Sequence, residues 1–173
     1  MGVSLEQKKR MVQEVADVAN EAYSALAAEY RGLSAGQMDN LRVRARESGV
    51  YVRVVKNTLA KRAVEGTDFE CMTDGFQGPL LLAFSQEDPG SAARVLKDFS
   101  KEHEQLVVKM LAVGGEMYPG SEIDRLATLP TYDEAISRLM ATMQAPVQKL
   151  ATTLNEVPGK LVRTLAAVKD AKQ

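Results

Sequence analysis

The chain has 173 residues, enough for one domain of ordinary size and an appendage, and its 45% hydrophobic and 26% charged content is typical of globular proteins. With 5% aromatic residues, no Trp and one cysteine, the composition argues against a base-stacking platform and excludes an internal disulfide. The net charge of −1 argues against general attraction to nucleic acid. No stretch approaches the roughly 18 apolar residues of a membrane span, so we expect a cytoplasmic protein without a membrane partner.

Two Ser-x-x-Gln capping boxes predict the first two helices. One box begins at Ser4 and its helix extends to about Ala22, and the other begins at Ser34 with a helix that ends at Gly49. Between them, YSALAAEY at residues 23–30 fits a strand.

The next segment predicts a strand and a short helix. VYVRVV at residues 50–55 is β-branched and almost continuously apolar, so we expect a strand covered on both faces. Asn57 or Thr58 is expected to cap a short helix that ends near Gly66.

Two more strands and two more helices follow. A buried strand is predicted at residues 78–85 and a further strand at residues 106–113, the latter closed by a Gly-Gly pair. Asp88 before proline predicts a helix that runs to about residue 102, and a short helix is expected over residues 121–129.

Alternating strands and helices predict an α/β sandwich with a central mixed sheet over residues 1–130. Residues 131–173 have only helical periodicity, beginning with a third capping box at Thr131. Pro146 and Pro158 interrupt this segment, and we expect them to kink or segment an extended C-terminal helix.

The sequence lacks catalytic motifs. HExxH, CxxC, GxSxG, Walker and GxGxxG patterns are absent. The single histidine, His103, is expected at the surface near a helix C-terminus, and Cys71 is expected to be a small packing residue. We therefore predict that the protein is not an enzyme and uses no cofactor or metal.

A basic window extends from Arg31 to Arg62. It holds eight basic residues and two acidic ones, a charge of +6, so the rest of the chain sums to −7. Arg42 and Arg46 lie four residues apart on one helix face, whereas Lys56 stands at a strand-to-helix junction where free amides attract phosphate. Helix capping and solvation of a helix face remain alternatives. The paucity of aromatics favours folded RNA over base-specific DNA.

The C-terminal segment repeats one apolar pattern at intervals of eleven residues. The hexads RLMATM, KLATTL and KLVRTL begin at Arg138, Lys149 and Lys160. Eleven residues at about 100° each make three turns plus about 20°, so the apolar stripe stays nearly on one face. It could fold back on the domain, pair as a homomeric coiled coil, or receive separate partner molecules. Prolines and equal repeats favour the last, and the modest basic content disfavours a membrane-surface helix.

Five strings carry a resemblance to a known family: YRGL, LRVRARESGVYVRVVKNTLAKRAVEGT, FQGPLLLAFS, PGSAARVLKDF and IDRLATLPTYDEAISRLMATM. They closely resemble the family of the tenth large-subunit ribosomal protein of bacteria, the base of the ribosomal stalk. The resemblance runs essentially end to end.

The resemblance implies an α/β domain bound to large-subunit rRNA beside the eleventh large-subunit protein. It also implies a C-terminal helix that docks dimers of the acidic stalk protein, which recruit translational GTPases. The family further represses translation of its own messenger by binding its leader.

The resemblance assigns two groups of residues. The family's RNA-contacting loops match Arg31, Gly32, Lys56, Asn57 and Thr58, and the neighbouring Arg42, Arg46, Arg53 and Lys61 are further candidates. The expected stalk-protein contacts are Leu139, Met140, Met143, Val147, Leu150, Leu154, Val157, Leu161, Val162 and Leu165.

One segment departs from the pattern expected of close family members. They pass from an RLMATM-like segment almost directly to a KLVRTL-like one, whereas QAPVQKLATTLNEVP lies between the two here. We therefore expect three stalk-protein dimers, one per hexad. The alternative is a self-associating coiled-coil adaptor with an incidental basic face.

Overall fold

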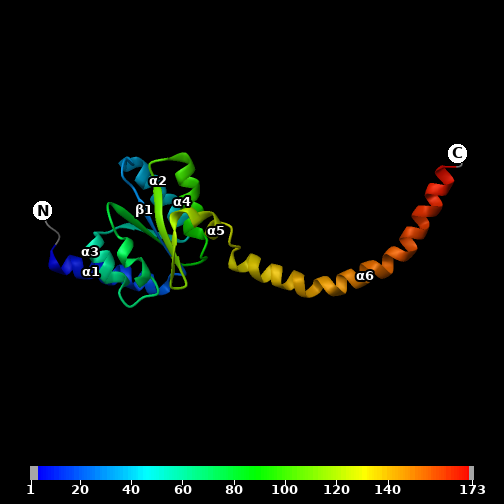
Figure 1. Ribbon diagram of the computed structural model, residues 1–173, viewed down its shortest axis with the longest axis horizontal. Coiled ribbons are helices and arrows are strands. Elements are labelled where there is room, and N and C mark those ends of the chain that lie inside the picture. Colours follow the sequence, from blue (N-terminus) through cyan, green and yellow to red (C-terminus); the bar gives the residue numbers. More distant parts are fainter. Residues whose placement is uncertain (1–3, 172–173) are drawn as a thin grey trace. The chain divides into compact units, whose positions relative to one another are not determined.

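The computed structural model describes residues 4–171 and divides after Thr131 into two compact units (Figure 1). The first unit contains α1 (Leu5–Glu21), β1 (Ser24–Glu29), α2 (Ala35–Glu47), β2 (Val50–Val54), α3 (Asn57–Val64), η1 (Glu70–Gly75), β3 (Leu80–Ser85), α4 (Ser91–Glu102), β4 (Val107–Val113), β5 (Glu116–Pro119), η2 (Gly120–Glu122) and α5 (Ile123–Ala127). The second contains α6 (Tyr132–Asp170).

The five strands form one sheet in the order β2-β3-β1-β4-β5. The α/β fold is confirmed, but the expected mixed sheet is wrong because all four pairings are antiparallel. β1, α2 and β2 form a split β-α-β unit: both strands pair with β3, which lies between them and runs opposite to each. Strands β1 and β2 therefore run in the same direction without pairing with each other, and their C-terminal residues lie at the same end of the sheet.

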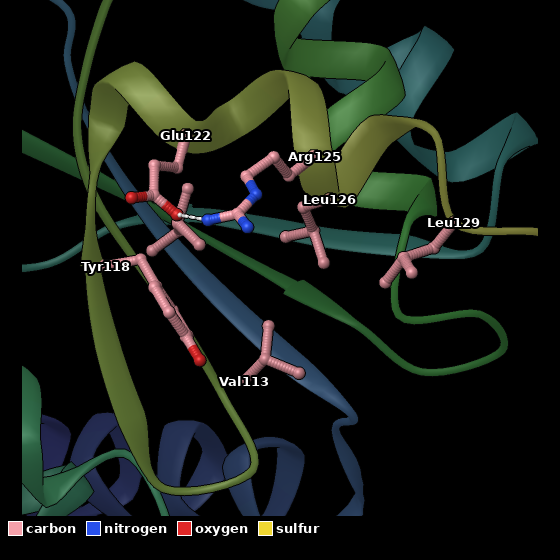
Figure 2. Close-up of a pocket in the computed structure, with 7 residues that line it drawn as sticks. Val113, Tyr118, Glu122, Arg125, Leu126 and Leu129 are labelled. Atoms are coloured by element: carbon pink, nitrogen blue, oxygen red, sulfur yellow. Dashed lines mark hydrogen bonds and ion pairs between the residues drawn. The ribbon is translucent and has the colours of Figure 1, made fainter.

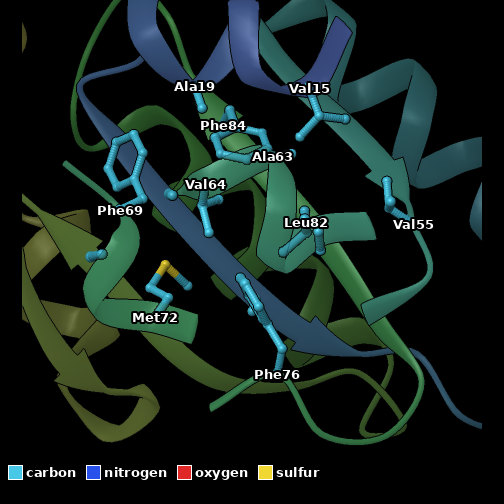
Figure 3. Packing of buried hydrophobic residues seen from close by; sticks show 14 of the residues in the cluster. Val15, Ala19, Val55, Ala63, Val64, Phe69, Met72, Phe76, Leu82 and Phe84 are labelled. Atoms are coloured by element: carbon cyan, nitrogen blue, oxygen red, sulfur yellow. The ribbon is translucent and has the colours of Figure 1, made fainter. Parts of the chain in front are cut away.

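Helices cover both faces of the sheet, as expected for a sandwich. α1, α3 and η1 enclose the core shown in Figure 3, whereas α2, α4 and α5 cover the other face. Strand β1 serves both cores by alternation, since Ala25 and Ala27 face the first and Leu26 and Ala28 the second. Five of its six residues are buried, and the strand expected over residues 23–30 is confirmed at Ser24–Glu29.

Strand β2 differs from its prediction. It lies at the edge of the sheet, and only Val50 of its five residues is fully buried. The expected cover on both faces is present but incomplete, since Tyr51 packs against one core and Val52 and Val54 pack against the other. A continuous β-branched run reports strand propensity, whereas the position in the sheet is decided by pairing with β3, which is distant in sequence.

The two N-terminal capping boxes are confirmed. Gln7 N–H donates to the Ser4 hydroxyl at 3.3 Å, and Gln37 N–H donates to the Ser34 hydroxyl at the same distance. Helix α2 ends before Gly49, whose φ of +64° favours glycine.

Two other expected caps are wrong. Lys56 is the N-cap of α3 and makes no side-chain capping bond, while the Asn57 amide donates instead to the Gly78 carbonyl at 2.9 Å. Helix α4 begins at Ser91, after N-cap Gly90, because the Ser85 hydroxyl binds the Asp88 carbonyl and holds that residue in the preceding turn.

A β-hairpin was missed. Gly114 and Gly115, expected only to close a strand, have φ of +59° and +85° and connect β4 to β5. Two successive positive φ values suit the tight turn of a hairpin.

Helix α6 is continuous over 39 residues and contains both Pro146 and Pro158. The prolines therefore do not break it into separate helices; it curves and is bent near Pro158 (Figure 1). Each proline removes one backbone donor, and the remaining hydrogen bonds continue the helix past it. Within residues 4–171, no helix is long and apolar enough to cross a membrane.

Candidate nucleic-acid interface and apolar helix face

The predicted RNA-contacting loops meet at one end of the sheet. Glu29 at the end of β1 pairs with Leu80, and Val54 at the end of β2 pairs with Leu81, so both strands end beside the start of β3. One hollow there is lined by Tyr30, Val54, Val55, Lys56, Asn57, Thr58, Gly78, Pro79 and Leu80. We call Arg31, Gly32, Lys56, Asn57 and Thr58 the sheet-end cluster.

Backbone geometry shapes the sheet-end cluster. Gly32 has a φ of +94°, and a Cβ there would lie 3.4 Å from the Gln105 side chain, so glycine suits the turn. Asn57 fastens the start of α3 to the Gly78 carbonyl, which leaves the exposed Lys56 and Thr58 beside the first amides of the helix. Those amides and the ammonium group together favour an anion.

Three of the four further candidates for rRNA contact lie along β2. Arg42, Arg46 and Arg53 line a second hollow beside this edge strand, together with Glu14. Arg46 is exposed and makes no ion pair within the described chain, whereas Arg42 pairs with Asp39 at 3.0 Å. Lys61 lies half-buried one turn beyond Asn57 on α3.

Arg53 is more constrained than its neighbours. Its guanidinium donates to the Tyr51 hydroxyl at 2.7 Å and pairs with Glu14 of α1. The hydrogen bond to Tyr51, opposed by burial and aided by Glu14, raises the pKa of Arg53. Arg53 therefore joins α1 to the edge strand β2. A contact between Arg53 and RNA would have to form alongside its bonds to Tyr51 and Glu14.

Arg44, also in the basic window, has another role. It pairs with Glu102 of α4 at 2.8 Å and its guanidinium carbon lies 5.7 Å from the centre of the Phe99 ring. The hydrogen bond from Arg44 lowers the pKa of Glu102. Arg44 thus links α2 to α4 on the other face of the sheet.

Replacing Glu102 with Gln should make stability less dependent on pH. Because the folded pKa lies below the ordinary 4.5, the ionised carboxylate stabilises the fold above that value, and this contribution is lost as pH falls through the folded pKa. We expect E102Q to lower the urea midpoint at pH 7 and to approach the wild type at acidic pH, where the Glu102 carboxylate is protonated in the folded state as well. The exposed Glu104, changed to Gln, is the matched control and should behave like the wild type at both pH values.

The predicted contacts on α6 are exposed. Leu139, Met140, Met143, Val147, Leu150, Leu154, Leu161, Val162 and Leu165 are 55–72% exposed. The side chain of Val157 lies outside the described part of the structure. At about 100° per residue these positions fall within about 140° of the helix circumference, which makes one apolar face.

The three hexads have the same internal geometry. The fifth residue of each, Thr142, Thr153 or Thr164, donates its hydroxyl to the carbonyl of the second, at 2.7, 2.8 and 2.8 Å. Each threonine thereby satisfies its own hydroxyl at the border of the apolar face. The hexads are structurally equivalent segments.

The described residues offer no catalytic arrangement. No group of three or more potential metal ligands occurs among them, and burial raises the pKa of the Cys71 thiol, which disfavours a thiolate. His103 is the C-cap of α4, as expected, and lies 3.3 Å from the Gln37 amide.

A small hollow lies beneath α5 (Figure 2). Its lining is mainly apolar, from Val113, Leu126 and Leu129 among others, and an ion pair joins Glu122 to Arg125 at 2.8 Å. The Glu122 carboxylate is engaged by the Arg125 guanidinium, and the Tyr118 hydroxyl donates to Glu116, so the polar groups of this hollow already have partners.

Comparison with known proteins identifies the family. The model described as "Ribosomal protein L10" matches residues 4–101, which exceeds half of the chain. The chain belongs to the ribosomal protein L10 family. A second model, "Ribosomal protein uL10 C-terminal region", matches residues 129–157 and so includes the first two hexads.

Full-length relatives support the family assignment. The proteins named "Large ribosomal subunit protein uL10" from Alkalilimnicola ehrlichii and Halorhodospira halophila are 74% and 72% identical over all 173 residues, with 99% of each relative covered. The same-named protein of Thioalkalivibrio sulfidiphilus is 62% identical, with 98% covered.

These relatives correct one expectation. Because they are covered almost completely by all 173 residues, they have nearly the same length as this chain. Residues 144–158, expected to be an additional segment, are therefore no insertion relative to them.

Proposed function

We propose that the protein is a structural component of the large ribosomal subunit and forms the base of the ribosomal stalk. The first unit binds large-subunit rRNA, and α6 anchors dimers of the acidic stalk protein, which in turn recruit translational GTPases. The protein acts in the cytoplasm as part of the ribosome. The observation that carries this proposal is the exposed apolar face of α6 in a chain of a ribosomal protein family.

The sheet-end cluster supports the rRNA contact. Exposed Arg31 and Lys56 lie in loops that one end of the sheet brings together, beside the glycine turn and the first amides of α3. Contacts of this kind bind phosphates and read backbone shape rather than base identity. The same surface would repress translation of the protein's own messenger by binding a leader that folds like the rRNA site. Binding at that rRNA site would also place the chain beside the eleventh large-subunit protein.

Replacing Lys56 with Ala should weaken rRNA binding several-fold and flatten its salt dependence. Each lost phosphate contact reduces the slope of log affinity against log salt by about 0.7 to 0.9. Titration of intact, protein-free large-subunit rRNA at several salt concentrations measures both quantities. Arg44, held by Glu102, provides the control as Arg44→Lys, and an unchanged slope in Lys56→Ala would contradict the assignment.

A self-associating adaptor is the competing proposal, since the exposed face of α6 could pair with a second copy. The eleven-residue interval argues against an ordinary left-handed coiled coil, which repeats every seven residues. Pro146 and Pro158 lie within the helix and would disturb a continuous knobs-into-holes seam. Separate short docking segments tolerate both features.

A further inference from the structure

A lysine distant in sequence from the basic window lies at the sheet-end cluster. The Glu29 carboxylate is shared by two cations: one oxygen lies 3.7 Å from Arg31 Nε and the other 3.1 Å from Lys109 Nζ. Glu29 is 24% exposed, whereas Arg31 and Lys109 are 78% and 49% exposed. The carboxylate is thus the more covered partner, and both cations extend further into solvent.

A β-bulge places Lys109 there. In the pairing of β1 with β4, Ala27 is opposite Met110 and Ala28 is opposite Val108, so Lys109 is the extra residue. Its neighbours enter the two opposite cores, Met110 beside α1 and α3 and Val108 beside α4. A bulge redirects a side chain that regular alternation would place elsewhere.

The local charge balance favours an anion. Glu29 cancels one of the two cations that it joins, so the group of three retains a charge of +1. Lys56 adds a further charge at the same end of the sheet. Lys109 is 49% exposed and its ammonium group has three N–H donors, so its bond to Glu29 leaves donors that can bind a phosphate as well.

We propose that Lys109 is a phosphate contact of the RNA interface and extends it from the loops after β1 and β2 onto β4. The proposal rests on the proposed rRNA binding. It extends the interface along one end of the sheet, from β2 through β3 and β1 to β4, with Glu29 holding Arg31 and Lys109 side by side. Nothing in the basic window indicates this residue, because β4 begins more than forty residues after Arg62.

The test uses the full-length chain and protein-free large-subunit rRNA. Lys109→Ala should reduce the salt slope of binding by about 0.7 to 0.9 and weaken affinity several-fold, and Lys109→Arg should restore both. Lys101→Ala is the matched control, since Lys101 also pairs with a carboxylate at 3.1 Å and is 66% exposed, but lies on α4 over the other face of the sheet.

Lysine acetylation of the wild-type chain, read by mass spectrometry with and without RNA, gives a second measurement that needs no variant. Lys109 should be protected by RNA and Lys101 should not. An unchanged salt slope in Lys109→Ala, or equal acetylation of Lys109 with and without RNA, would overturn the inference. Absence of RNA binding by the wild-type chain would overturn the proposed function as well, which separates the two failures.

Discussion

Removal of residues 132–173 is expected to abolish binding of the acidic stalk protein and to leave rRNA affinity within about twofold of the full-length value. The apolar face lies entirely on α6, whereas the sheet-end cluster and both hydrophobic cores lie in the first unit. The first unit keeps its core after truncation because every residue described in the two cores belongs to that unit. Isothermal titration with stalk protein and filter binding with rRNA measure the two activities.

Circular dichroism and thermal unfolding of the truncated chain provide the control for folding. Residual binding of stalk protein to the folded fragment would place the docking surface on the first unit. Loss of rRNA binding by that fragment would contradict the proposed division of functions.

Placing two lysines in the middle hexad should remove one of three docked dimers. Leu150 and Leu154 are 63% and 69% exposed and lie one turn apart on the apolar face, so L150K with L154K leaves the fold intact and charges the surface that a partner must bury. We expect the number of bound dimers to fall from three to two, as measured by sedimentation equilibrium with excess stalk protein.

The polar side of the same turn offers a matched control. Gln148 and Thr152 are also four residues apart, and at about 100° per residue they lie on the opposite side of α6. Replacing both with Lys adds the same charge and should leave three dimers bound. Three dimers on the L150K/L154K chain would show that the middle hexad is no docking segment.

Local signals predicted local structure well. The capping boxes at Ser4 and Ser34 each combine a side-chain acceptor with a glutamine one turn later, and both hold in the structure. The eleven-residue interval likewise predicted the apolar face of α6, because a regular helix converts spacing directly into direction. The hairpin turn at Gly114 could also have been predicted from the sequence, since paired glycines before a short alternating segment favour such a turn.

The pairing of strands that are distant in the chain could not be predicted from local sequence patterns. VYVRVV has the composition of a buried strand, yet β2 is an edge strand because β3 inserts between β1 and β2. The same insertion makes the sheet antiparallel. Asn57 is a residue type that favours helix N-caps, but its side-chain amide donates to the Gly78 carbonyl instead.

The candidate RNA interface was predictable in part. Arg31 and Lys56 are close in sequence, and the split β-α-β unit brings their loops to one end of the sheet. Spacing separates Arg44 from the helix face that carries Arg42 and Arg46, but its partner Glu102 lies on α4 and no local pattern indicates that pair. Lys109 requires knowledge of the β1–β4 register, which no local pattern supplies.

The mass of the complex in native mass spectrometry tests the central proposal most directly. The chain alone should appear as a monomer of 18.9 kDa, and saturation with acidic stalk protein should add the mass of three dimers, one for each hexad. A dimeric or larger chain in the absence of stalk protein would support the coiled-coil adaptor instead. Saturation at two dimers would contradict the three-segment account.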